Sequence, residues 1–181
     1  METRTLVETV FDSIVAIDPG SSSGSLVLCT FSPDPKNPYT VEVSNLPDTI
    51  EGLWGLIHLT AEQLQGRSGN TLWVVENVGG SMPGNSAKSS RVFAEHVGAL
   101  KMALIAAGTK NRWFPVPKKW MHELYKDDVD FPKGMERKAL RKTYIYEDMR
   151  RRWKDIKFTK RQADAMAILT WAILTTRGQP K

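Results

Sequence analysis

Cysteine and histidine, the residues that most often bind zinc, are scarce in this sequence. Cys29 is the only cysteine, so an intramolecular disulfide and a cysteine-rich zinc site are both excluded, which fits a reducing compartment. We expect this thiol to be an ordinary buried side chain. His58, His96 and His122 show no metal-ligand spacing, and structural or surface roles are expected for them.

Long apolar runs are also missing. No segment approaches the roughly 20 apolar residues that cross a bilayer. The first dozen residues carry acids at Glu2, Glu8 and Asp12, which is unlike a signal peptide. These absences argue against a membrane partner and predict a cytoplasmic protein.

The formal net charge of +5 hides an uneven distribution along the chain. Residues 1–100 hold 5 Lys and Arg against 11 Asp and Glu, a net charge of −6, whereas residues 101–181 hold 20 against 9, a net charge of +11. Many of these bases fall within residues 150–161. Such a field is what nucleic-acid binding requires, although a solvated helix face is the plainer interpretation of a charge run.

With 181 residues, 41% hydrophobic and 25% charged, the chain has the size and composition of one domain over residues 1–181. Turn residues and apolar periodicity divide it into strands and helices. We expect strands over residues 14–18, 24–31, 39–46, 71–76 and 112–116, helices over 49–66, 88–107, 117–125, 136–153 and 160–176, and loops over 77–87 and 127–135. The first three strands should form an antiparallel meander, and the apolar strand 71–76 should lie centrally. This order is typical of an α/β fold of the ribonuclease H-like kind, a mixed five-stranded sheet flanked by helices.

Three carboxylates stand in apolar surroundings. Asp18 ends the first strand before a turn rich in Gly and Ser, Glu76 ends the strand 71–76, and Asp164 lies among alanines of the last helix. Taken singly, Asp18 could be a turn or helix-cap residue, Glu76 a charge at a strand end, and Asp164 an exposed helix residue. Burying three carboxylates without partners would cost free energy, however, and a cation bound by all three would explain their positions. An oxygen-only site favours Mg²⁺, with Mn²⁺ as a substitute, over zinc. Two such ions about 4 Å apart suit phosphodiester hydrolysis.

The segments around these acids resemble the RuvC-like Holliday junction resolvases, particularly the small forms found in bacteriophages. The matching motifs, in order, are Ile17-Asp18-Pro19-Gly20 with Gly24, Val75-Glu76-Asn77-Val78, Met82-Pro83-Gly84 with Gly98, Val116-Pro117 with Trp120, and Ala163-Asp164-Ala165. The resemblance spans most of the chain. It implies that Asp18, Glu76 and Asp164 bind the catalytic divalent metal ions, that four-way DNA junctions are the substrate, and that the enzyme is a homodimer. It also implies the host cytoplasm as the location if a bacteriophage encodes the chain.

One position departs from that family's pattern. Many members carry a further Asp or His one helical turn before the last aspartate, and this chain has Arg161 there. Arg161 is expected to contact either the scissile phosphate or the DNA backbone more generally. Asp155 would supply a fourth carboxylate only if the loop between it and the last helix folded back.

Basic residues near the predicted site are candidates for DNA contact. The set comprises Lys88, Arg91, Lys118, Lys119, Arg150, Arg151, Arg152, Lys160 and Arg161. Core packing is expected for Phe93 and Trp120, with a wedge between bases as the alternative for Phe93. The apolar helix around 92–107, with Val92, Leu100, Leu104 and Ile105, is either a core helix or a dimer surface.

These features predict a Mg²⁺-dependent endodeoxyribonuclease that resolves four-way DNA junctions by paired cleavage. One alternative is a nuclease with the same site and a broader branched-DNA substrate, such as flaps or forks. A non-catalytic DNA-binding module is a second alternative. An actin-like or sugar-kinase ATPase also begins with an aspartate before a Gly-rich turn, but it needs a second lobe and a longer chain.

Overall fold

The computed structural model describes residues 11–20, 22, 24–65, 70–79, 86–125 and 135–177, with the backbone alone for 135–138. The expected loop over 77–87 therefore lies largely outside the described residues, and the expected loop over 127–135 almost entirely so. Within the described part, no helix is long and apolar enough to cross a membrane.

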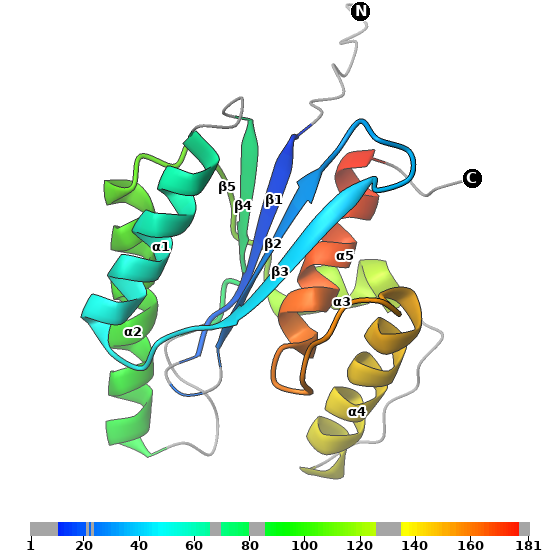
Figure 1. The fold of residues 1–181 in the computed structure, drawn as a ribbon. Helices are drawn as coiled ribbons and strands as arrows, with labels where there is room; N and C mark the ends of the chain where they lie inside the picture. Colours follow the sequence, from blue (N-terminus) through cyan, green and yellow to red (C-terminus); the bar gives the residue numbers. More distant parts are fainter. Residues whose placement is uncertain are drawn as a thin grey trace, which may run out of the picture.

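Five strands form one sheet (Figure 1). They are β1 (Ser13–Asp18), β2 (Ser25–Phe31), β3 (Tyr39–Asn45), β4 (Thr71–Val75) and β5 (Asn111–Trp113). Their order is β3-β2-β1-β4-β5, with β1, β2 and β3 antiparallel and β4 and β5 parallel to β1. The predicted meander and the central place of the fourth strand are both confirmed.

Helices cover both faces of the sheet (Figure 1). They are α1 (Ile50–Gln65), α2 (Ala87–Ala106), α3 (Pro117–Tyr125), α4 (Met135–Arg152) and α5 (Ala163–Arg177). Because side chains alternate along a strand, Val15 and Ile17 of β1 join the core beneath α1 and α2, whereas Ile14 and Ala16 join the core beneath α5. Helix α5 is buried on nearly all sides because α3 and α4 pack over it.

Two predicted boundaries were wrong by three residues. Strand β5 ends at Trp113 instead of residue 116, since Pro115 cannot donate a ladder hydrogen bond. Helix α5 begins at Ala163 instead of residue 160. The amide oxygen of Gln162 accepts hydrogen bonds from the backbone N–H and the hydroxyl of Thr159, and this holds residues 159–162 in a turn.

The turn after β1 depends on a close backbone approach at Gly24. A Cβ at this position would lie 2.6 Å from the nitrogen of Gly20 and 2.7 Å from Cδ1 of Leu46. The backbone N–H of Leu46 donates to the carbonyl oxygen of Gly24 at 2.9 Å, so the same glycine also fixes the end of β3. This turn immediately follows Asp18 and sets the surroundings of its carboxylate.

We expect Gly24→Ala to lower the free energy of unfolding by about 1–3 kcal/mol, because the added methyl group overlaps backbone atoms. Gly55→Ala is the matched control. A Cβ at Gly55 meets nothing within 4 Å, and Ala is preferred over Gly in a helix by about 1 kcal/mol. Urea denaturation of both variants is the measurement, and equal stability of Gly24→Ala and the wild type would contradict the expectation.

Candidate functional site

The parallel pairing of β1 with β4 places two of the predicted acids side by side. Ile17 pairs with Val75, so Asp18 and Glu76 follow at the same end of neighbouring strands. The backbone N–H of Glu76 donates to the carbonyl oxygen of Ile17 at 3.0 Å, which carries the pairing one residue past the end of β4. Glu76 is buried, whereas Asp18 is partly exposed.

Helix α5 brings the third acid to the same edge of the sheet. Asp164 is its second residue, where the positive end of the helix dipole favours a carboxylate. Small buried alanines on both sides, Ala163 and Ala165, let the helix approach β1 closely. Just before the helix, the Gln162 amide donates to Oδ1 of Asn45 at 3.0 Å, which ties the start of α5 to the end of β3.

The three carboxyl groups act on one another electrostatically. Burial, followed by the charges of Glu76 and Asp164, holds the pKa of Asp18 well above its usual range. Burial is also the main reason that the pKa of Glu76 rises to about 6. A hydrogen bond joins the side chains of Asp18 and Glu76; it raises the pKa of Asp18 and lowers that of Glu76. The hydrogen bond therefore favours protonation of Asp18 over protonation of Glu76.

Trp120 fixes the position of the Glu76 carboxylate through a hydrogen bond. Its indole Nε1 donates to Oε1 of Glu76 at 2.7 Å, and the ring is almost fully buried. This bond opposes the effect of burial and lowers the pKa of Glu76. The predicted packing role of Trp120 is thus confirmed, but the sequence analysis missed its bond to Glu76. Its place three residues after Pro117, at a helix start, was the available signal.

Two basic residues of α4 that the sequence analysis did not single out face the acids. Nζ of Lys142 lies 3.9 Å from Oδ2 of Asp164, and its charge lowers the pKa of Asp18. The charge of Arg141 lowers the pKa of Glu76. Among the described side chains, Nε of Arg141 is one of few buried polar atoms without a hydrogen-bond partner. No sequence signal distinguished these two residues from the other bases of α4, because only the tertiary packing of α4 on α5 brings them here.

The acids are gathered, but their present arrangement is not that of a metal-ligand set. Within the described residues, no group of three or more His, Cys, Asp or Glu side chains is placed to hold a metal ion. Asp18 and Glu76 are bonded to each other, and Glu76 also accepts from Trp120. The donor chemistry nevertheless suits a hard divalent cation, because three mutually repelling carboxylates supply only oxygen ligands.

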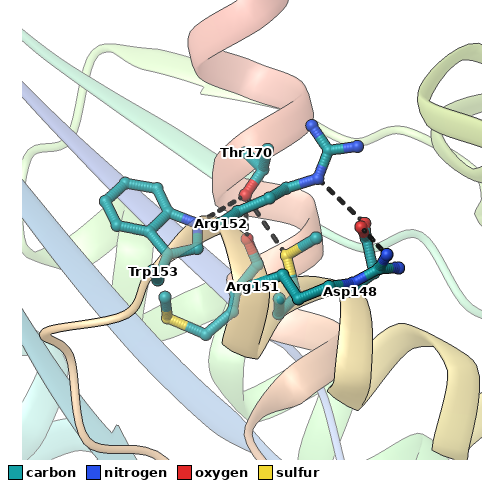
Figure 2. A network of polar contacts seen from close by, with 7 residues as sticks. Asp148, Arg151, Arg152, Trp153 and Thr170 are labelled. Carbon is teal, nitrogen blue, oxygen red and sulfur yellow. Dashed lines mark hydrogen bonds and ion pairs between the residues drawn. The ribbon is translucent and has the colours of Figure 1, made fainter.

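Two of the three arginines that end α4 form ion pairs within the protein. Arg152 Nε lies 2.9 Å from Oδ2 of the buried Asp148, and Arg151 lies 3.5 Å from its Oδ1. Figure 2 shows this network beside a second one, in which Trp153 Nε1 donates to the Thr170 hydroxyl at 2.9 Å. The two arginine pairs lie within α4, whereas the bond from Trp153 to Thr170 links the end of α4 to α5. Arg150 has its guanidinium 5.9 Å from the centre of the Phe158 ring.

The remaining DNA-contact candidates are exposed side chains on several elements. Lys88 and Arg91 lie in the first turns of α2, where Arg91 is bonded to Glu95 at 2.8 Å. Lys118 and Lys119 begin α3, next to Trp120. Lys160 donates to the Thr143 hydroxyl at 2.6 Å, and Arg161 lies in the turn before α5. Their contacts with DNA stay predictions.

Other expectations about individual residues have mixed outcomes. Cys29 is fully buried in β2 and burial raises the pKa of its thiol to about 12, so the expected unreactive role is confirmed. His96 is buried and its Nε2 lies 3.0 Å from the carbonyl oxygen of Pro47, a structural contact. Asp155 is exposed and is not among the charges that shift the pKa of Asp18 or Glu76.

The apolar helix proposed as a dimer surface presents its residues in two directions. Leu100 and Leu104 of α2 are buried against the sheet, whereas Val92 and Ile105 are about half exposed. Phe93 is only partly buried. Helix α2 is therefore a core helix with an apolar outer edge.

The raised pKa of Glu76 leads to a prediction about the free energy of unfolding. A folded-state pKa of about 6 against 4.5 in the unfolded chain means that the ionised side chain destabilises the fold above pH 6. We expect Glu76→Gln in EDTA to gain about 2 kcal/mol of unfolding free energy at pH 7.5, and to lose most of that gain as the pH falls from about 6 to 4.5.

Glu123→Gln is the matched control for this experiment. The exposed Glu123 also accepts an indole N–H, from Trp171 at 2.7 Å, so the substitution tests the same hydrogen bond without the burial. Urea denaturation across the pH range is the measurement. A Glu76→Gln variant no more stable than the wild type at pH 7.5 would show that the buried charge is not destabilising.

The fold has been compared with known proteins. A structure of T. thermophilus RuvC in complex with a Holliday junction substrate superposes with a TM-score of 0.56 at 18% sequence identity, covering 91% of this chain and 94% of that one. Another Thermus thermophilus RuvC structure gives a TM-score of 0.48 at 21% identity, covering 92% and 96%. No protein-family model matches the chain, and no curated protein matches it in sequence. The mixed five-stranded sheet flanked by helices is therefore a RuvC-like fold of the ribonuclease H-like kind.

Proposed function

We propose that the chain is a Mg²⁺-dependent endodeoxyribonuclease that resolves four-way DNA junctions by paired phosphodiester cleavage. The observation that carries this proposal is the convergence of Asp18, Glu76 and Asp164 from β1, β4 and α5 at one edge of the sheet. The RuvC-like fold supports it, and so does the expected kinship with the small bacteriophage resolvases. The whole chain would act as one nuclease domain.

The carboxylates would hold the divalent cation. When bound, the ion supplies the positive charge that stabilises the attacking and leaving oxygens of an in-line displacement. Metal ligands bind in their deprotonated form, which the raised pKa values of Asp18 and Glu76 oppose in the metal-free protein. Trp120 keeps one oxygen of Glu76 engaged through its indole N–H and so limits the directions in which the other can point.

Helix α4 supplies the complementary positive charge. The buried Nε of Arg141 has no hydrogen-bond partner among the described residues, and a phosphate oxygen would satisfy it. Nζ of Lys142 lies 3.9 Å from Oδ2 of Asp164, and the ammonium group can pair with either that carboxylate or a nearby phosphate. In this proposal Arg141 holds the scissile phosphate against the acids, a role for which a planar guanidinium is suited.

Assembly as a homodimer follows from the substrate. A four-way junction has approximate two-fold symmetry, and a two-fold dimer would set two identical sites against opposed strands, giving paired nicks. The basic residues of α2, α3 and the segment 150–161 would contact the arms. This part of the proposal rests on the resemblance alone.

The proposed metal site is tested by DNA cleavage. Asp18→Asn, Glu76→Gln and Asp164→Asn should each lower the cleavage rate at least about a hundredfold, the size of losing one electrostatic contribution in an active site. The assay uses a four-way junction in Mg²⁺ with mapping of nicks, and Mn²⁺ should substitute. Junction binding in Ca²⁺ should survive in all three variants.

A substrate panel separates the proposed function from its alternatives. Paired symmetric nicks on the junction, with little cutting of flaps and forks, support a resolvase. Equal cutting of all branched DNAs would assign the chain to a broader branched-DNA nuclease. Binding without any Mg²⁺-dependent cleavage would leave a non-catalytic DNA-binding module, and cleavage in EDTA would contradict the metal mechanism.

A second prediction concerns Arg141. Arg141→Gln should lower the cleavage rate at saturating junction by roughly 10- to 150-fold, as expected for one charge-assisted hydrogen bond. Arg141→Lys should not restore it, because an ammonium lacks the guanidinium fork. The control is Lys36→Gln, an exposed base in the turn between β2 and β3 to which no DNA contact is assigned. If Arg141→Gln cleaves as fast as Lys36→Gln, the charge of Arg141 serves only to balance that of Glu76.

A further inference from the structure

A hollow of about 630 Å³ lies between α2 and the outer strand of the sheet, beside the candidate active site. Its lining residues are Asn77, Lys101, Ile105, Lys110, Arg112 and Phe114. The volume falls in the range of small-ligand sites, about 300–1,000 Å³. None of the roles assigned above uses this hollow.

The alternation of a β-strand explains why these side chains gather. Lys110, Arg112 and Phe114 are two residues apart along β5 and its flanks, so they point to the same face of the sheet. Helix α2 contributes Lys101 and Ile105 from across the hollow. At about 3.3 Å per residue, the run from Lys110 to Phe114 spans about 13 Å.

An exposed aromatic ring sits at one end of this surface. Phe114 is 40% exposed, and Nζ of Lys101 lies 5.7 Å from its ring centre. Ile105 nearby is 56% exposed. A large apolar face bordered by cations is the combination on which nucleobases stack while their phosphates are neutralised.

The charge of the hollow is of one sign. Lys101, Lys110 and Arg112 line it, and no acidic side chain does. A second hollow of about 540 Å³ adjoins it at Arg112 and Phe114 and adds Lys119. Four bases without an acid along the lining of two adjoining hollows complement a polyanion.

The hollow reaches the residue next to Glu76. Asn77 belongs to its lining, and the backbone N–H of Asn77 donates to the carbonyl oxygen of Pro115 at 2.8 Å. This bond ties the segment after β4 to the segment after β5. The lining of the hollow therefore begins one residue after Glu76 in the chain.

We infer that this hollow binds an unpaired nucleotide of the DNA substrate, with its base stacked on Phe114 and its phosphates beside Lys101, Lys110 and Arg112. The inference rests in part on the proposed function, because a DNA substrate at the carboxylates would supply the strand. A junction or other branched DNA can expose such a nucleotide at the branch point.

Fluorescence anisotropy with a labelled oligothymidylate, in EDTA to prevent cleavage, tests this inference. Phe114→Ala should weaken binding roughly fivefold to a hundredfold, the effect of losing one stacked base, and Phe114→Trp should retain it. Trp54→Ala is the matched control, since Trp54 is an aromatic residue of similar exposure, 46%, on α1, which has no Lys or Arg. Far-UV circular dichroism checks that each variant is folded.

The contribution of the basic side chains to binding is measured separately, through the salt dependence of the affinity. Replacing both Lys101 and Lys110 with Gln should flatten the salt dependence of oligothymidylate binding by about 0.7 log units per decade of salt for each lost phosphate contact. Lys36→Gln, in the exposed turn between β2 and β3, should leave the slope unchanged.

The outcomes separate the inference from the proposed function. If the wild type cleaves junctions while Phe114→Ala binds oligothymidylate as tightly as Trp54→Ala does, the inference alone is wrong. If no branched DNA is cleaved while Phe114→Ala loses binding, the proposed function is wrong and the inference stands. If Phe114→Ala instead weakens self-association in light scattering and leaves DNA binding intact, the hollow is an interface between copies, which also overturns the inference.

Discussion

The parallel pairing of β1 with β4 is the constraint on which the rest of the site depends. It brings two acids that are 58 positions apart in the chain to neighbouring strand ends, where a hydrogen bond joins their side chains. Burying two carboxyl groups together costs free energy, and the protein offsets this cost locally. An indole N–H, a guanidinium and an ammonium reach the cluster from α3 and α4. Helices on that face of the sheet are therefore arranged around the electrostatics of the site as much as around the apolar core.

The sequence predicted the order and type of every described strand and helix, because apolar runs, turn residues and helix starts were well separated. It also predicted that Asp18, Glu76 and Asp164 would converge, since acids in apolar segments need a common partner. It could not predict that Arg141 and Lys142 face them. In a helix with this many bases, only the packing of α4 on α5 selects which ones point inward.

The misjudged start of α5 has a long-range component. Gln162, whose amide oxygen holds the turn over residues 159–162, also donates to Asn45, a contact across 117 positions that no local pattern reveals. The DNA contacts of the arginine run 150–152 stay a prediction. Arg151 and Arg152 pair with Asp148 of the same helix, and their side chains remain partly exposed. Long-range polar contacts such as the one from Gln162 are the usual limit of reasoning from composition and periodicity.

The anchoring of α4 has a mechanical consequence. Its C-terminal half is buried at Ile145 and Met149 and is latched to α5 through the bond from Trp153 to Thr170, whereas Ala139 and Leu140 are exposed. Arg141 and Lys142 precede this buried segment, one turn before Ile145, so any displacement of the first half of α4 would move both cations together relative to the carboxylates.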